Sequence, residues 1–178
     1  MEALEAIMTR KSVRHFLAEP VPDETLRTIL QAAMSGPSCT NARDWQFLVV
    51  RDKAMLQKMA EANGRPAQPL RGAAVGILVC GDLTRAFPPA PDYWVVDGAI
   101  AAQNLILAAH ALGVGSVWLG TWPQLERVQA QVRLFGLPAA AVPHSLIALG
   151  WPDPAKEAPG PRRDRPAWEE SRVHWEQW

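Results

Sequence analysis

The residues best suited to bind an anion lie near the N-terminus, where Arg10, Ser12 and Arg14 alternate with Lys11 and Val13. A guanidinium group presents a planar fork of N–H donors, and a serine hydroxyl adds another, so this spacing can meet a phosphate group. The alternative interpretation is a solvated basic end of the preceding helix, which the helix dipole would favour. Both interpretations stay open for this segment taken alone.

Two further segments could approach a flat, ring-shaped ligand. Residues 36–41 (Gly-Pro-Ser-Cys-Thr-Asn) offer free backbone donors and short side chains, although an ordinary helix-to-strand turn would look the same. Residues 117–122 (Val-Trp-Leu-Gly-Thr-Trp) end an apolar stretch, where Gly120 lets a ligand come close to the backbone. The alternative for this second segment is that its tryptophans pack in the core.

A basic cluster of Arg162, Arg163 and Arg165 is a fourth candidate, although most such runs are simply solvated charge. The sequence lacks a Gly-x-Gly-x-x-Gly fingerprint, a phosphate loop and a Gly-x-Ser-x-Gly elbow. Its four histidines and two cysteines show no metal-ligand spacing. We therefore predict neither a metal site nor a catalytic side-chain nucleophile, and expect a bound cofactor to carry the chemistry.

Composition excludes several classes of protein. The 178 residues balance eighteen basic against eighteen acidic side chains, which argues against a chain that coats nucleic acid or an anionic membrane. Cys39 and Cys80 cannot form a disulfide framework, so we expect a reducing, cytoplasmic compartment. The chain opens on a helix-like acidic segment rather than a signal peptide, and polar residues and glycines interrupt its most apolar stretch, residues 97–120, so we expect no membrane span.

Hydrophobic periodicity predicts helices alternating with strands. The pattern favours strands over residues 46–50, 73–80, 116–119 and 142–149, with helices over 2–9, from Asp23 to Gly36, around 55–63, over 92–112 and after Pro123. Asp23 is the expected N-cap of the second helix, and Pro123 is expected in the first turn of the last one, with Leu125, Val128 and Val132 facing inward. This order predicts a mixed α/β or α+β sandwich.

The helix over residues 92–112 is apolar nearly all round, which implies burial on every side. Few positions in so small a chain are that central, so we expect a subunit interface there. From residue 153 onward, prolines and arginines make a core improbable, which divides the chain into a core, residues 1–152, and an arm, residues 153–178. Because Trp175 and Trp178 would form a costly apolar patch in solvent, we expect the arm to dock on a second subunit.

Taken together and in this order, these features resemble the flavin-dependent nitroreductase family. The matching motifs span residues 10–16, 32–45, 97–105, 112–118 and 149–152, followed by the Arg-rich, Trp-ended tail, and so cover essentially the whole chain. The resemblance implies an α+β, three-layer sandwich with a mixed central sheet flanked by helices. It also implies a homodimer that exchanges the C-terminal arm and holds two molecules of FMN in clefts at the subunit interface.

The resemblance further implies roles for individual residues toward FMN. Arg10 and Ser12, with Lys11 between them, would hold the phosphate with help from Arg163 and Arg165 of the arm, and Arg162 competes for that role. Arg14 would lie near the pyrimidine edge of the ring, where a cation stabilises negative charge on the reduced flavin. The ring would be reached from the partner subunit by Pro37, Ser38, Cys39 and Asn41. Gly120 would present its backbone N–H to flavin N5, beside Trp118, Leu119 and Thr121.

The implied activity is a ping-pong oxidoreduction in which NADH or NADPH gives a hydride to flavin N5 and an electron-poor small molecule, such as a nitroaromatic or a quinone, then takes its place. The alternatives are an FMN-binding redox sensor or flavin-storage protein, a dehalogenase-type relative, and a non-enzymatic dimeric scaffold with a basic arm. One motif departs from the family pattern. Where the family often has Asn-x-Gln-Pro-Trp, this chain has Asn41-Ala42-Arg43-Asp44-Trp45, which changes the charge at the expected cleft edge.

Overall fold

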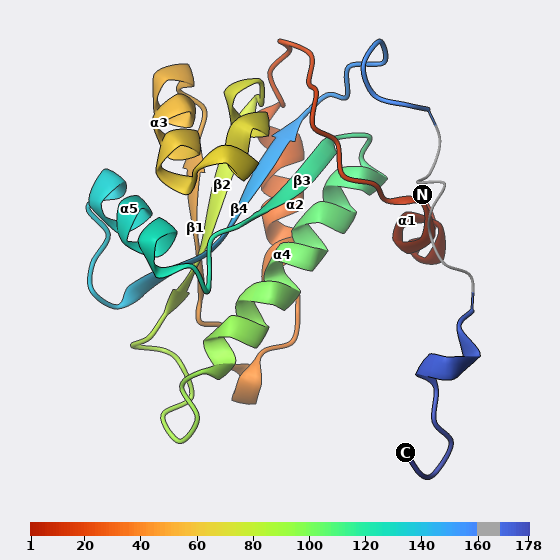
Figure 1. Cartoon of the computed structure of the whole chain (residues 1–178), viewed down its shortest axis with the longest axis vertical. Coiled ribbons are helices and arrows are strands. Elements are labelled where there is room, and N and C mark those ends of the chain that lie inside the picture. Colours follow the sequence, from red (N-terminus) through yellow and green to blue (C-terminus); the bar gives the residue numbers. More distant parts are fainter. Residues whose placement is uncertain (160–167) are drawn as a thin grey trace.

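The computed structural model describes residues 1–159 and 168–178 and has four strands joined in one sheet within that part of the chain (Figure 1). The strands lie in the order β1-β2-β4-β3 and comprise β1 (Trp45–Val50), β2 (Val75–Asp82), β3 (Gly115–Gly120) and β4 (Ala141–Gly150). We expected a mixed sheet, but neighbouring strands pair antiparallel throughout. The parallel pairing in the described structure is one isolated bridge, between Ser12 and Ser116.

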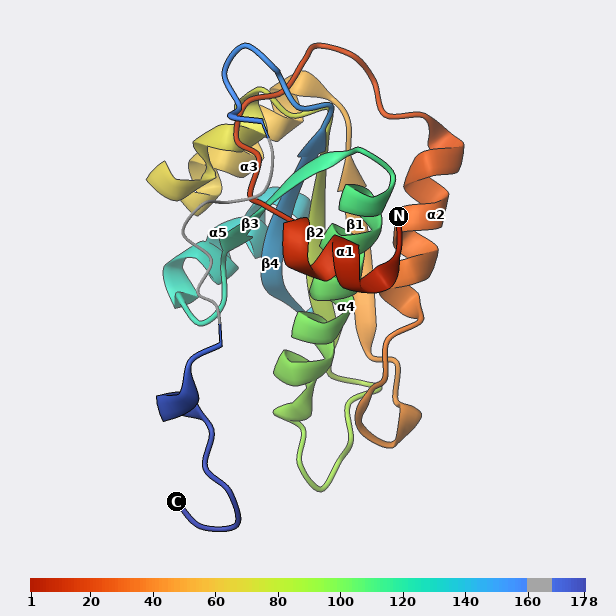
Figure 2. The same cartoon turned by 90° about the vertical axis from the view of Figure 1, so that its right-hand side faces the viewer.

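Helices cover both faces of this sheet and give the expected three layers. In Figures 1 and 2, α2 (Asp23–Met34) and α4 (Tyr93–Ala111) lie on one face, and α3 (Lys53–Asn63) and α5 (Leu125–Phe135) lie on the other. The short helix α1 (Ala3–Thr9) lies beside α4. Short 3-10 segments occupy η1 (Cys39–Asn41), η2 (Arg65–Arg71) and η3 (Glu170–Arg172). The α+β class and the helix-flanked sheet are therefore confirmed.

The central strand β2 shows why both faces need a helical layer. Its side chains alternate between faces, so that Ile77 and Val79 join the core under α2 and α4, whereas Leu78 and Cys80 join the core under α3. All four side chains are buried. A strand that is apolar on both sides would expose a large hydrophobic surface if either helical layer were absent.

Three local expectations about the helices are wrong. Asp23 is the first residue of α2 and not its N-cap, because Pro22 takes the cap position and the Asp23 carboxylate pairs with Arg51 instead, at 2.5 Å. Pro123 precedes α5, which begins at Leu125. The Leu125 side chain is exposed, and the buried residues of that helix are Val128 and Gln131.

Within one chain, α4 is not buried on every side as its composition suggested. It buries Trp94, Leu105 and several small residues against the sheet, but Val96 remains 50% exposed. The neighbouring helix α1 buries only Ala6 and exposes its apolar side chains, namely Leu4, Ile7 and Met8. The described residues include no helix that combines the length and apolarity needed to cross a membrane.

The chain beyond β4 has two described parts. Residues 153–159 lie against the N-terminal segment of the same chain, where Asp153 N donates to His15 O at 3.0 Å. Residues 168–178 extend away from the sheet in both Figure 1 and Figure 2. Their tryptophans, Trp168, Trp175 and Trp178, are all exposed. The docking of residues 153–178 on a partner subunit stays a prediction.

Candidate flavin-binding edge of the sheet

The basic segment, residues 10–14, lies along β3, one of the two edge strands. Ser12 bridges to Ser116, and Val13 N donates to Ser116 O at 2.8 Å. The contact depends on Gly115, since a Cβ there would lie 2.7 Å from a Val13 methyl group. Tertiary structure thus joins the predicted phosphate segment and the predicted ring segment, which are about 100 residues apart in sequence.

The other end of β3 offers open space. A Cβ added to Gly120 would meet nothing within 4 Å, and Gly120 does not have a positive φ angle. Neither packing nor backbone conformation within this chain therefore requires glycine at that position. Ser116 and Gly120 are four residues apart in β3, or about 13 Å, a length comparable to an extended flavin mononucleotide from phosphate to ring.

The residues around Gly120 divide between core and edge. Leu119 is buried in the core under α3, and the fully buried Thr121 donates its hydroxyl to Asn63 Oδ1 at 2.9 Å. A ligand at this edge can therefore meet only the backbone of these two residues. Trp118 is half-buried on the α4 face, where its ring packs edge-on against His144 with the ring centroids 5.7 Å apart.

Sequence reasoning did not single out His144, whose ring packs against that of Trp118. Burial lowers the pKa of His144 to about 4, so the imidazole is neutral at pH 7. Its ring also packs edge-on against Trp94, at 5.9 Å between centroids. The aromatic cluster of Trp94, Trp118 and His144 is therefore uncharged at pH 7.

The start of the arm is hydrogen-bonded to the basic segment of its own chain. The Lys11 ammonium donates to the Ala158 carbonyl, and Glu157 Oε1 accepts from Arg14 N and His15 N at 2.7 and 2.8 Å. Partial burial would raise the pKa of Glu157, but the hydrogen bonds from these two backbone N–H groups lower it below its usual range. The Arg14 side chain stays exposed, and its guanidinium donates to Ser12 O at 3.3 Å. The arginines of the arm, Arg162, Arg163 and Arg165, lie outside the described residues.

The loop that carries Pro37, Ser38, Cys39 and Asn41 is held in an unusual conformation. Thr40, Asn41 and Arg43 all have positive φ angles, which cost a non-glycine residue about 1–2 kcal/mol each. Hydrogen bonds offset that cost: Arg43 N donates to Ser38 Oγ at 2.9 Å, and Arg43 Nε donates to Asn41 Oδ1 at 2.9 Å. Both carboxylate oxygens of Asp97 accept from Cys39 N, at 3.0 and 3.1 Å.

A buried carboxylate lies next to this loop. Asp44 is fully buried rather than at a cleft edge, and neither of its carboxylate oxygens accepts a hydrogen bond from a described donor. Burial, and then the charge of Asp97, raise the pKa of Asp44 to about 6. Burial likewise raises the pKa of Asp97, and burial together with the two carboxylates raises that of Cys39. The described residues hold no group of three or more His, Cys, Asp or Glu side chains suited to a metal ion.

Within one chain, this loop does not reach the basic segment. The loop meets α4 at Asp97, near the start of the helix, whereas Thr9 Oγ1 lies 2.8 Å from His110 Nε2, near the end. Thirteen residues of helix between Asp97 and His110 span about 20 Å. Figure 1 shows the same separation, with the loop at one end of α4 and α1 near the other.

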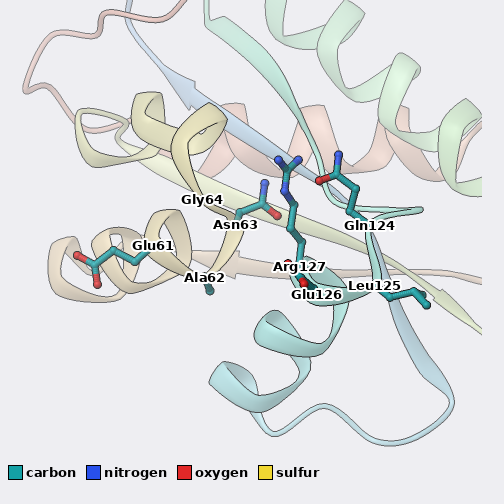
Figure 3. A pocket seen from close by; sticks show the side chains of 8 residues that line it. All are labelled: Glu61, Ala62, Asn63, Gly64, Gln124, Leu125, Glu126 and Arg127. Atoms are coloured by element: carbon teal, nitrogen blue, oxygen red, sulfur yellow. The ribbon is translucent and has the colours of Figure 1, made fainter.

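A pocket of about 520 Å³ lies behind the Gly120 end of β3, between the end of α3 and the start of α5 (Figure 3). It is lined by Glu61, Ala62, Asn63, Gly64, Gln124, Leu125, Glu126 and Arg127. Two of these side chains hold the Gly120 carbonyl: Asn63 Nδ2 donates to it at 3.1 Å, and Arg127 Nη1 donates at 2.8 Å. Sequence reasoning took Asn63 only as the end of a helix and passed over Arg127, because no local pattern connects either residue to Gly120.

Comparisons with known proteins identify the family of the chain. The sequence profile described as "Nitroreductase family" matches residues 7–70 and 64–151. A relative from Methanothermobacter thermautotrophicus, provisionally named NADH dehydrogenase/NAD(P)H nitroreductase, is 43% identical over 178 residues, which cover 100% of this chain and 88% of the relative.

Two solved structures show that the fold is shared as well. A Bacteroides thetaiotaomicron protein of the same provisional name superposes with a TM-score of 0.88 at 36% identity, covering 99% of this chain and 98% of that one. A Desulfovibrio desulfuricans protein, provisionally named a nitroreductase and solved in complex with FMN, superposes with a TM-score of 0.75 at 34% identity over 92% of each chain. With the profile matching nearly the whole core and the fold shared end to end, the chain belongs to the nitroreductase family.

Proposed function

We propose that this protein is an FMN-dependent oxidoreductase that takes reducing equivalents from NAD(P)H and passes them to nitroaromatics, quinones or similar electron-poor acceptors. Membership of the nitroreductase family supports the oxidoreductase class. The FMN found in the related Desulfovibrio structure, and the NAD(P)H in the name of the Methanothermobacter relative, support the cofactor and the donor. The two half-reactions would share one site, in a ping-pong sequence.

The observation that carries this proposal is the open space at Gly120, at the end of an edge strand whose other end is bridged to the basic segment. In the proposed complex, Arg10 and Ser12 hold the FMN phosphate, with Lys11 adjacent and with Arg163 and Arg165 of the arm. The ring would then extend along β3, where the Gly120 N–H would donate to its N5, beside Trp118 and the backbone of Leu119 and Thr121.

FMN, when bound, supplies the chemistry: it accepts a hydride at N5 from NAD(P)H, which leaves as NAD(P)⁺, and it passes the two electrons to the acceptor. The chain's own residues would bind the FMN and orient its ring. The Arg14 guanidinium is exposed and has no ion-pair partner among the described residues, so it is available to stabilise negative charge at the pyrimidine edge. The Trp118 ring, packed on the neutral and buried His144 ring, would limit the access of water to that side of the site.

A homodimer is part of the proposal, because one chain leaves the site incomplete. The loop with Pro37, Ser38, Cys39 and Asn41 lies about 20 Å along α4 from the basic segment. A twofold axis across α4 would bring the start of one α4 near the end of the other, and thus the partner's loop to the flavin. The exposed apolar side chains of α1, with Val96 of α4, would be covered in that dimer, and so would the arm tryptophans. We also propose a reducing, cytoplasmic location, in keeping with the free thiols of Cys39 and Cys80.

The visible spectrum of the purified protein, before and after anaerobic addition of NADH or NADPH, tests this function. We expect a yellow protein that bleaches with one or both nucleotides and then turns over menadione or nitrofurazone. A yellow protein that neither nucleotide bleaches would favour flavin storage or redox sensing. A colourless protein that cannot take up added FMN would overturn the proposal and favour a scaffold.

A further inference from the structure

A hydrogen-bonded network surrounds the Gly120 carbonyl, at the end of β3 that faces the proposed flavin. Asn63, at the end of α3, and Arg127, in α5, both donate to the Gly120 carbonyl, and Thr121 donates to Asn63. Asn63 and Thr121 are fully buried. Figure 3 shows the Asn63 and Arg127 side chains reaching the same region of the pocket from two different helices.

The network restrains the last residue of β3, where pairing with β4 ends at Ser145. Glycine has the widest range of backbone conformations, and Gly120 is the last residue of an edge strand with open space where a Cβ would be. In an antiparallel strand, a residue directs its N–H and its C=O toward the same side, so holding the carbonyl also sets the direction of the N–H. Two donors, one of them charged, make this a strong restraint.

Arg127 has no carboxylate partner to account for its position. Within the described part of the chain it forms no ion pair, although Glu126 and Glu61 line the same pocket. Its Nη1 donates to a neutral carbonyl instead. The half-buried Arg127 guanidinium thus donates to one backbone oxygen and pairs with no described carboxylate. A role in fixing the position of the Gly120 peptide explains this arrangement.

We propose that Asn63 and Arg127 are positioning residues, which hold the Gly120 carbonyl so that the Gly120 N–H, on the same side of the strand, meets flavin N5 in the geometry that hydride transfer requires. The inference rests on the proposed function for its flavin, but the restraint on Gly120 belongs to the chain alone. Neither residue touches the cofactor in this account. Loss of either should therefore slow flavin reduction without releasing the FMN phosphate.

The test compares Arg127→Met, which keeps the apolar stem, and Asn63→Asp, which keeps the shape and removes the donor, with Arg133→Met as a control on the exposed side of α5. Anaerobic stopped-flow mixing of the FMN-loaded proteins with NAD(P)H measures the rate constant of flavin reduction. We expect it to fall about ten-fold or more in either positioning variant and to stay unchanged in the control. The FMN dissociation constant, from fluorescence titration, should change less than three-fold in all three variants. Because both residues act on one carbonyl, the double variant should lose less than the product of the single losses.

A second measurement needs no flavin. In protein labelled with [¹⁵N]glycine, the Gly120 amide signal, identified by its loss in Gly120→Ala, should be sharp in the wild type and in Arg133→Met but broadened or split in Arg127→Met. Wild-type reduction rates together with an unaltered Gly120 signal in Arg127→Met would overturn the inference, whether or not Asn63→Asp folds. A wild-type protein that takes up no FMN would instead refute the proposed function, and the amide signal would still report on the restraint.

Discussion

Replacing Asp44 by asparagine should stabilise the fold at neutral pH, even though the residue is fully buried. Its carboxylate receives no hydrogen bond from a described donor and lies near the second buried carboxylate, Asp97. Asparagine has nearly the same shape, carries no charge and can donate to Asp97. The substitution Asp44→Asn therefore removes an unfavourable charge without opening a cavity.

The size and the pH dependence of the effect follow from the pKa of Asp44, which rises from 3.8 to about 6 through burial and then the charge of Asp97. Between these values the folded protein keeps a proton that the unfolded chain loses, so the wild type becomes less stable as the pH rises through this window. Each pKa unit is worth about 1.4 kcal/mol, which gives a penalty of about 2–3 kcal/mol above pH 6 and little penalty near pH 4.

Urea unfolding of the wild type and of Asp44→Asn at pH 8 and pH 4, all at one protein concentration, measures this difference. The control is Asp92→Asn, which removes the same charge from an exposed residue just before α4. We expect Asp44→Asn to be more stable by about 2–3 kcal/mol at pH 8 and nearly unchanged at pH 4. An equal gain at both pH values, or no gain at pH 8, would refute the electrostatic reasoning.

Three further predictions concern the proposed cofactor site. Arg10→Ala should weaken FMN binding by about 1.5–3 kcal/mol, the loss of a charge-assisted hydrogen bond, and unchanged affinity in a fluorescence titration would place the phosphate elsewhere. Deleting residues 161–178 should cost both FMN and the dimer, so a yellow dimer on size exclusion would contradict the arm proposal. Gly120→Ala should change the free energy of unfolding by less than about 0.5 kcal/mol, since a Cβ meets nothing there, but should weaken FMN binding at least ten-fold. Full FMN affinity in that variant would show that the open space does not face the ring.

Much of the fold could be predicted because its signals are local. A continuous apolar run predicted a strand over residues 46–50, and β1 spans Trp45–Val50. The N-cap of α2 was predicted wrongly, since any Asp ahead of a helical pattern resembles an N-cap. Asp23 instead pairs with Arg51, which lies on a different element and could not be foreseen from local sequence.

For the candidate site, the sequence predicted individual residues but not the contacts between distant segments. The glycine at position 120 signalled close approach to the backbone, and the structure adds that the space beside it is open. The partners of its carbonyl, Asn63 and Arg127, meet it only after α3, α5 and β3 pack together. The sequence predicts that Asp44 changes the charge at the cleft edge, and the packed structure adds that its side chain is fully buried, which is rare for an acidic residue.

The exposed edge of the sheet explains why a cofactor site should form along β3. An edge strand presents unpaired backbone groups that invite pairing with other chains, and proteins cover or interrupt such edges. Here the basic segment covers the first half of β3, through the bridge between Ser12 and Ser116. The second half, from Trp118 to Gly120, forms no bridge to another segment in the described structure. Asn63 and Arg127 satisfy the Gly120 carbonyl, and the glycine leaves room for a flat group against the backbone. A flavin ring in that space would cover the rest of the edge and place its N5 on a backbone donor, so that the same surface protects the strand and carries the chemistry.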